Sequence, residues 1–326
     1  MEEKSRILKK IDEDKTRPVL FNESFGGSEN QLRFLLKYLP DESFKDINLI
    51  LNNADHSLIE KDRINILWMQ HFVNQKEVQN LGSKEYVDKL DYIVFNSNWN
   101  FEKFQYQFKV PENKSLVIKN AIEKIEFHKK TKEKINLIYH TTPWRGLVNL
   151  VKIFKSLNLE NVELTVCSST KIYGKKFSDV IEKKYENIFN ECKNTTSLNY
   201  MGFVENKIII ELLNRLHIYS FPSIWPETSC ISAIESMAAG CEVVTTNLGA
   251  LYETCAPFGT FVSFDRNLDN LEKKFKKTLV ASIKNYWSEA NQKKLRLQSE
   301  TINTTYSWDI RKDEWKNFLD EARKVK

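Results

Sequence analysis

The sequence predicts an α/β protein made of two domains, each built on a parallel β-sheet. Short apolar, β-branched runs alternate with longer amphipathic stretches of helical periodicity, which is the pattern of doubly wound sheets. The alternation restarts after a polar, lysine-rich interval, Glu123 to Lys134, which we interpret as the linker between the domains. A chain of 326 residues is long enough for two domains of ordinary size.

The expected strands form two series. Those of the first series are Pro18 to Phe21, Ile47 to Leu51, Ile64 to Met69, Tyr92 to Phe95 and Leu116 to Ile118. Those of the second are Ile135 to Tyr139, Val162 to Cys167, Leu198 to Met201, Ile218 to Phe221 and Glu242 to Thr245. The tail from Tyr306 has the periodicity of an amphipathic helix. Two Rossmann-like domains would leave a cleft between the carboxyl ends of their sheets, where such folds bind ligands.

The amino-acid composition and net charge exclude several classes of protein. Hydrophobic residues make up 41% and charged residues 29%, as in soluble globular proteins. The net charge of +5 is scattered, so it suits an anionic small ligand and does not demand nucleic acid. Five cysteines without paired spacing indicate neither a disulfide framework nor a zinc site. Neither a signal peptide nor a long apolar run is evident, so we expect a cytoplasmic protein; peripheral contact with a membrane stays open.

The most informative stretch follows the strand that ends at Phe221. A proline-containing loop carries Glu227, and Thr228 or Ser229 could cap a helix that Gly240 stops. The free amides at such a helix start, beside small residues that include Cys230, suit a phosphate or diphosphate.

Glu235 falls on the apolar side of this helix. It shares a face with Ile231, Ile234 and Ala238, whereas Ser232 and Ser236 lie opposite. Burying an unpaired carboxylate is costly, so Glu235 needs hydrogen-bond donors. Ligand hydroxyls are one source, and a structural ion pair or helix cap is the other.

Three further parts of the sequence are expected at positions that a ligand could reach: Arg145, His71 and the pair Gly26 and Gly27. Arg145 follows the first strand of the second domain and could bind phosphate oxygens; the alternative is a solvated loop cation. His71 should emerge at the carboxyl edge of the first sheet, unless it is structural. Gly26 and Gly27 permit close backbone approach to a ligand or serve only a turn. This stretch fits neither G-x-G-x-x-G nor a P-loop, so dinucleotide oxidoreduction and ATP hydrolysis find no support.

Glu227 and Glu235, separated by seven residues and followed by SMAAGCEVVTT, resemble the E-x7-E motif of family 4 glycosyltransferases. The preceding segment, YMGFVENKIIIELLNRLHIYSFPSIWPE, is similar to the corresponding part of that family. The resemblance implies the GT-B fold, in which two Rossmann-like domains face each other across a cleft. The acceptor-side domain would span residues 1–123, completed by a C-terminal helix over about 309–326, and the donor domain would span residues 124–308.

The resemblance also implies roles for individual residues. Glu235 would hold the ribose of a nucleotide sugar, and Glu227 and His71 would lie near the sugar. Many family members carry an arginine and, five residues later, a lysine; here His140 and Arg145 stand at these places, so one permanent cation would stabilise the departing diphosphate. The remaining residues expected at the donor are Thr228, Ser229, Cys230 and Ile231 near the diphosphate, Gly202, Phe203 and Val204 by the base, and Gly26 and Gly27 in the glycine loop.

The expected function is that of a retaining glycosyltransferase that moves a hexose from a nucleotide-diphosphate sugar to a hydroxyl of a glycan or lipid-linked glycan. No cofactor, metal or nucleic acid is expected. Asp12-Glu13-Asp14 imitates a metal-binding Asp-x-Asp but lies on a charged helix, which favours a solvated charge cluster. Two alternatives stay open. One is a nucleotide-sugar epimerase or phosphorylase on the same fold, and the other is a degenerate GT-B nucleotide-binding protein without turnover, suggested by His140 and the short first domain.

Overall fold

The computed structural model describes residues 1–13 and 21–325. The chain forms two compact units: Met1–Ala121 with Tyr306–Lys326, and Ile122–Thr305. We call these unit 1 and unit 2 and describe each by itself. The unit boundaries lie two and three residues before the places where the sequence suggested domain boundaries.

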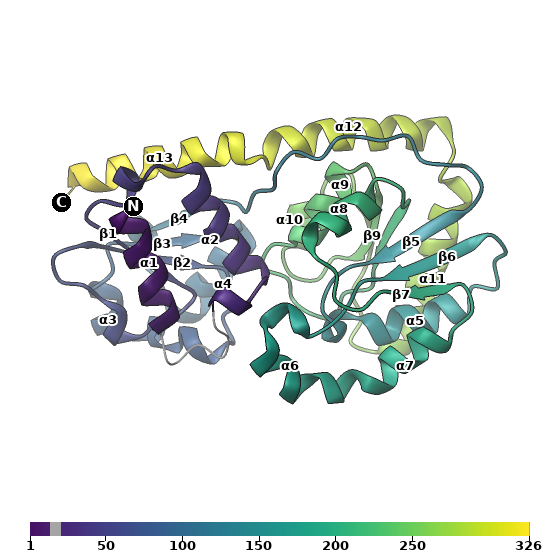
Figure 1. Ribbon diagram of the computed structural model, residues 1–326, viewed down its shortest axis with the longest axis horizontal. Coiled ribbons are helices and arrows are strands. Elements are labelled where there is room, and N and C mark those ends of the chain that lie inside the picture. Colours follow the sequence, from purple (N-terminus) through teal and green to yellow (C-terminus); the bar gives the residue numbers. More distant parts are fainter. Residues whose placement is uncertain (14–20, 326) are drawn as a thin grey trace. The chain divides into compact units, whose positions relative to one another are not determined.

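Unit 1 contains a parallel sheet with the strand order β1-β2-β3-β4 (Figure 1). Its strands are β1 (Ile47–Leu51), β2 (Ile64–Met69), β3 (Tyr92–Phe95) and β4 (Ser115–Val117). Its helices are α1 (Glu2–Glu13), α2 (Gly27–Tyr38), α3 (Lys84–Asp88), α4 (Asn98–Phe108) and α13 (Trp308–Val325). Of the strand expected at Pro18 to Phe21, residues 18–20 lie outside the described residues. Phe21 begins a 3-10 turn instead of a strand.

Both faces of the unit 1 sheet are covered, because its strands are apolar on both sides. Ile64, Ile66 and Trp68 of β2 join a core with residues of α1, α2 and α13. Leu67 and Met69, which alternate with them, join a second core with residues of α3 and α4. Helix α13 is held mainly by aromatic residues, in the pairs Trp308–Tyr38, Trp315–Trp68 and Phe318–Tyr92.

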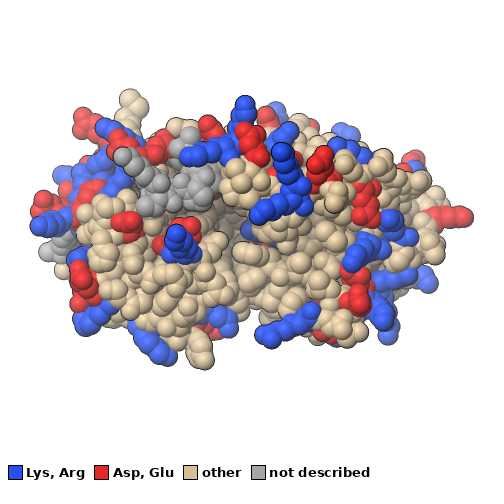
Figure 2. All heavy atoms as spheres, turned by 90° about the horizontal axis from the view of Figure 1, so that it is seen from below, with Lys and Arg blue, Asp and Glu red and all other residues tan. Residues whose placement is uncertain are grey.

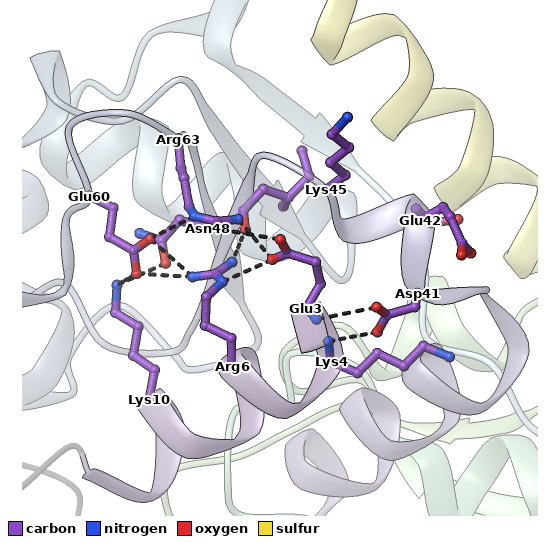
Figure 3. A network of polar contacts seen from close by, with 12 residues as sticks. Glu3, Lys4, Arg6, Lys10, Asp41, Glu42, Lys45, Asn48, Glu60 and Arg63 are labelled. Carbon is purple, nitrogen blue, oxygen red and sulfur yellow. Dashed lines mark hydrogen bonds and ion pairs between the residues drawn. The ribbon is translucent and has the colours of Figure 1, made fainter. Parts of the chain in front are cut away.

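An ion network fastens α1 to the rest of unit 1 (Figure 3). Arg6 lies between two carboxylates, with Nε 3.0 Å from Glu3 Oε2 and Nη1 3.0 Å from Glu60 Oε2. Arg63 pairs with Glu3 at 2.8 Å, and Lys10 pairs with Glu60 at 2.6 Å. The hydrogen bond from Arg63 lowers the pKa of Glu3, with a further contribution from Arg6. Each charge thus has a partner on another turn or loop.

Unit 2 contains a parallel sheet with the strand order β10-β9-β8-β5-β6-β7. The strands are β5 (Ile135–Tyr139), β6 (Val162–Val166), β7 (Leu198–Tyr200), β8 (Ile218–Phe221), β9 (Glu242–Thr246) and β10 (Thr260–Val262). The helices are α5 (Leu147–Lys155), α6 (Lys175–Ile181), α7 (Glu186–Asn194), α8 (Asn206–Leu213), α9 (Ile231–Ala238), α10 (Leu251–Cys255), α11 (Leu268–Asn285) and α12 (Glu289–Thr305). Helix α5 packs with α7 and α11, and α9 packs with α12 on the opposite face of the sheet (Figure 1).

The strand order of unit 2 reverses between β5 and β8. From β5 the chain proceeds outward through β6 and β7, and then returns to place β8 on the other side of β5. Loops that follow the two central strands therefore diverge at their carboxyl ends, which creates the usual ligand-binding position of a doubly wound sheet.

The interval that we interpreted as a linker, residues 123–134, contains neither helix nor strand, but it is not simply a solvated connection. Residues 122–134 belong to unit 2, and Ile125 and the stem of Lys130 are buried. The backbone amide of Ile125 donates to Asn303 Oδ1 over 2.8 Å. The segment is therefore packed along its own unit despite its polar composition.

Charges on the described surface are mixed. On the face drawn in Figure 2, blue and red side chains are interspersed among the described residues, without one continuous basic tract. Asp12 accepts a hydrogen bond from Asn22, and Glu13 lies 3.7 Å from Lys9; Asp14 lies outside the described residues. None of the described helices has the length and hydrophobicity that crossing a membrane requires.

Candidate functional site

Arg145 and Glu227 come together from opposite sides of the strand reversal in unit 2. Arg145 ends a 3-10 turn after β5, and Glu227 lies in the loop after β8. Nη1 of Arg145 is 2.6 Å from both carboxylate oxygens of Glu227. The Arg145 side chain is 24% exposed and that of Glu227 only 4%, so Arg145 is not the solvated loop cation of the alternative interpretation.

Two glycines allow the backbone to approach closely enough for this pair to form. A Cβ atom on Gly146 would lie 2.3 Å from the carbonyl oxygen of Pro222, in the loop after β8. A Cβ atom on Gly249 would lie 2.5 Å from the backbone nitrogen and oxygen of Glu227. Both glycines also have positive φ, at +129° and +71°. Larger residues would push apart the loops that carry Arg145 and Glu227.

The environment of the Arg145–Glu227 pair has opposing effects on the pKa of the Glu227 carboxyl group. Burial raises the pKa of Glu227 above its ordinary value, while the charge and hydrogen bonds of Arg145 counteract the shift. Nε of Arg145 is buried without a hydrogen-bond partner among the described residues. Arg145 therefore retains a donor that an additional anion could use after rearrangement of the loop.

Glu235 occupies a second acidic position on α9. Its side chain is buried, and Oε1 accepts a hydrogen bond from Asn206 Nδ2 over 2.9 Å. Burial raises the pKa of Glu235 to about 7, and the bond from Asn206 only partly opposes this shift. No ion pair of Glu235 is present among the described residues, so the structural ion pair that we considered is not formed there. A carboxylate in this position lacks strong donors, which ligand hydroxyls could supply.

Asn206 was not among the residues that the sequence analysis selected. It is the first residue of α8, shortly after the Gly202-Phe203-Val204 segment. The available signal was an amide side chain at the start of a helix close to a predicted ligand loop. Only the structure shows that Asn206 contacts Glu235.

His140 is buried and neutral. Burial lowers its pKa to about 3. Its Nε2 lies 2.8 Å from Ser236 Oγ, and Ser236 Oγ donates to the carbonyl of Ser232, so Nε2 must donate to Ser236. The ring also packs 4.8 Å from that of Tyr219. His140 therefore supplies no positive charge beside Arg145, and Ser236, which helical periodicity placed opposite the apolar face of α9, is also buried.

The amino end of α9 differs in one detail from the expectation. Its N-cap is Cys230, not Thr228 or Ser229, and it has no side-chain cap. Thr228 and Ser229 precede the cap as half-buried loop residues, and Ile231 begins the helix. The helix runs to Ala238, and Gly240 beyond it has a φ of +76°. The first backbone amides of an uncapped helix have no intrahelical partner, so they can receive an anion.

The remaining predicted residues lie in two places. In unit 2, Gly202, with a φ of +66°, follows β7, and Phe203 is exposed while Val204 is half-buried. In unit 1, Gly26 is the N-cap of α2 and Gly27 its first residue.

His71 lies at the carboxyl end of β2, where its backbone is fixed by asparagine side chains. Asn52 Oδ1 accepts from the amide of His71 over 3.1 Å, and Asn100 Nδ2 donates to its carbonyl over 3.2 Å. The structure thus gathers Arg145, Glu227, Glu235 and His140 on the same unit, and places His71 and the glycine pair on the other.

Comparisons with known proteins agree with this architecture. The family model described as "Glycosyl transferases group 1" matches residues 118–294, more than half of the chain. No curated protein sequence matches the chain. Similar solved structures include a glycosyltransferase from Rickettsia africae (15% identity, TM-score 0.64, 86% of this chain and 78% of that chain). They also include Anabaena HepE in complex with UDP-glucose (13%, 0.62, 84% and 79%) and sucrose-phosphate synthase from Thermosynechococcus elongatus (14%, 0.63, 86% and 74%). At these identities the likeness shows the fold alone, and it confirms the predicted GT-B fold.

Proposed function

Because this chain belongs to the group 1 glycosyl transferases, we propose that it is a retaining, family 4-type enzyme that transfers a hexose from a nucleotide-diphosphate sugar to a hydroxyl of a glycan or lipid-linked glycan. The observation that carries the proposal is the arrangement at the strand reversal of unit 2. There Glu227 and Glu235, with seven residues between them, flank the uncapped amino end of α9, and Arg145 reaches Glu227 from the other side.

Each part of this arrangement has a chemical task in the proposed reaction. The amides around Cys230 and Ile231 receive the diphosphate, since a helix amino end favours anions. Arg145 exchanges part of its contact with Glu227 for phosphate oxygens and stabilises the negative charge that grows on the leaving group. Glu227, released toward the sugar, accepts hydrogen bonds from its hydroxyls.

Glu235 is the proposed ribose anchor. Its carboxylate is buried with one neutral donor, Asn206, so two ribose hydroxyls would supply the hydrogen bonds that it lacks. The resemblance adds Gly202, Phe203 and Val204 near the base, and His71 with Gly26 and Gly27 on the sugar side. We take uridine nucleotides as the first donors to test, since HepE and a pneumococcal O-GlcNAc transferase were both solved with UDP or a UDP-sugar.

The first experiment is a nucleotide panel followed by thermal unfolding. UDP-, GDP-, ADP- and dTDP-sugars and the free diphosphates are added without metal. A ligand at 100 times its dissociation constant adds about 2.7 kcal/mol to the free energy of unfolding. Glu235→Ala should abolish the stabilisation by the best ligand. Full affinity in this variant would overturn the ribose assignment, and stabilisation by none of the panel would favour the degenerate-fold alternative.

Turnover is tested with the donor that the panel selects. We propose that transfer needs neither a metal ion nor a cofactor, so EDTA should leave the rate unchanged; loss of turnover would contradict this. Formation of an epimeric sugar without an acceptor would identify an epimerase instead, and formation of a sugar phosphate when inorganic phosphate is added would identify a phosphorylase. The anomeric configuration of the product, read by NMR, tests the retaining mechanism.

A further inference from the structure

Lys130 is a buried cation for which the proposed reaction has no direct use. Its residue is 7% exposed, and its ammonium group donates to two backbone carbonyls, those of Leu213 and of Ala239, the latter over 3.0 Å. A third neighbour, Cys241 Sγ, lies 3.9 Å away. Burial lowers the pKa of Lys130. A buried ammonium ion bound to carbonyls instead of a carboxylate is costly, so its position calls for an explanation.

Its two carbonyl partners lie at the carboxyl ends of two helices. Leu213 is the last residue of α8, and Ala239 is the C-cap of α9. A positive charge at the carboxyl end of a helix interacts favourably with the helix dipole, and here one ammonium ion serves two helices. Lys130 therefore joins α8 and α9 at one end.

The opposite ends of the same helices carry donor-site groups. Asn206, the first residue of α8, donates a hydrogen bond to Glu235, and the backbone amides at the amino end of α9 have no side-chain cap. Each helix has eight residues, or roughly 12 Å at 1.5 Å per residue, so Lys130 lies too far along the helix axes to touch the nucleotide. It can act on the donor only through the placement of the two helices.

The other described side chains that contact this end of α9 are uncharged. One of them, Cys241 in the connection to β9, also reaches α8, with its Sγ 3.4 Å from the carbonyl oxygen of Leu213. Gln298 of α12 donates to the carbonyls of Met237 and Cys241, over 3.1 and 2.8 Å. Lys130 differs from Gln298 because it binds both helices at once and carries charge. A substitution of Gln298 therefore tests the capping of α9 alone, whereas a substitution of Lys130 also tests the joining of α8 and α9.

We propose that Lys130 is a positioning residue of the donor site: by joining the carboxyl ends of α8 and α9, it keeps Asn206 against Glu235 and the amino end of α9 in place for the diphosphate. The proposal rests on the function proposed above. It extends the donor site to a segment, residues 123–134, whose composition suggested only a linker.

The test measures UDP affinity at pH 8 by calorimetry in a double-mutant cycle of Lys130→Met and Asn206→Ala. We expect Lys130→Met to weaken UDP binding about tenfold. Because both substitutions remove the same constraint on Glu235, the loss of affinity caused by Lys130→Met should be smaller in the Asn206→Ala background than in the unsubstituted protein. Additive losses, or an unchanged affinity in Lys130→Met, would overturn the proposal.

Two controls separate positioning from general stability. Lys132→Met removes an exposed lysine of the same segment, whose ammonium lies over the Trp287 ring, and should leave both UDP affinity and the melting temperature unchanged. Gln298→Leu should lower the melting temperature but keep UDP affinity within about twofold. An affinity loss in Gln298→Leu equal to that of Lys130→Met would show that helix capping alone explains the effect, and would overturn the proposal.

A variant that does not fold, and a protein that binds no nucleotide, can both be distinguished from a failure of the role proposed for Lys130. If Lys130→Met does not fold, Lys130→Gln, which keeps a neutral donor, takes its place in the cycle with the same expectations. If the unsubstituted protein binds no UDP or other nucleotide of the panel, the proposed function fails. If it binds UDP and Lys130→Met binds equally well, only the role of Lys130 fails.

Discussion

Glu235, the proposed ribose anchor, also affects how the stability of the folded protein depends on pH. Its pKa is raised from an ordinary value of 4.5 to about 7 in the folded protein, chiefly by burial. Between these values the folded protein holds a proton that the unfolded chain has released. The contribution of Glu235 to the free energy of unfolding therefore falls as the pH rises from about 4.5 to about 7 and does not change further above that window.

Glu235→Gln removes this dependence, since a glutamine keeps the acceptor for Asn206 without a charge. At pH 8 we expect the variant to be more stable than the unsubstituted protein by up to about 3 kcal/mol, and at pH 4 equally stable. Urea unfolding at the two pH values measures the difference. Equal stability at pH 8 would contradict the buried position of the carboxyl group, whatever its role in binding.

Glu227 is predicted to compete with the donor for Arg145. Glu227→Gln removes the negative charge that holds Nη1 of Arg145, so we expect UDP to bind about tenfold more tightly. Sugar transfer should nevertheless fall by about a hundredfold or more, because the hydrogen-bond acceptor proposed for the sugar is weakened. Calorimetry and a radiolabelled transfer assay measure the two effects. Weaker UDP binding would show that Glu227 supports the nucleotide instead of competing with it.

At the residue scale, spacing in the sequence selected Arg145, Glu227 and Glu235 but could not reveal their contacts. The side chains follow different strands, and their distances depend on loop conformations such as the left-handed turn at Gly249. Asn206 was missed for the same reason, because its relation to Glu235 is tertiary. Burial of His140 and Ser236 also depends on packing that a helical pattern does not specify.

At the scale of elements, the ion network of α1 gives a prediction for unit 1 (Figure 3). Arg6→Met leaves Glu3 and Glu60 with fewer partners, so we expect the free energy of unfolding to fall by about 1–2 kcal/mol. Lys84→Met, which breaks an exposed pair with Asp88, should change it by less than about 0.5 kcal/mol. Equal effects in urea unfolding at low salt would show that the network adds nothing beyond an ordinary surface pair.

Strands were predictable where burial on both faces makes a continuous apolar run. β1, β2, β3, β5 and β8 have the predicted limits, β6, β7 and β9 differ by one residue at one end, and β4 is shifted by one residue at both ends. β10 was not predicted, and it lies at the edge of the sheet, where it pairs with β9 alone. The cap of α9 was misplaced because Cys230, an unusual N-cap, follows two residues that are common ones.

At the scale of the whole molecule, the sequence indicated two α/β domains because it contains two successive series of alternating strands and helices. The structure likewise forms two α/β units. At residues 123–134 the lysine-rich sequence suggested only a linker between the domains, but this segment packs along unit 2. Lysine has a long apolar stem, so the structure can bury Lys130 and still direct its ammonium group to backbone carbonyls. The number of charges in a segment therefore does not decide whether it packs.

The two units should respond differently to a nucleotide. With the exception of Gly26, Gly27 and His71, the residues proposed at the donor belong to unit 2. We therefore expect UDP added to the full chain to slow hydrogen exchange about tenfold or more at residues 202–206 and 228–236, and to leave residues 1–121 within about twofold. Exchange followed by mass spectrometry locates the change. Glu235→Ala at the same UDP concentration is the control, since it should remove protection from both segments together. Protection concentrated in residues 1–121 would place the nucleotide on the wrong unit, and would overturn the donor site while leaving the fold intact.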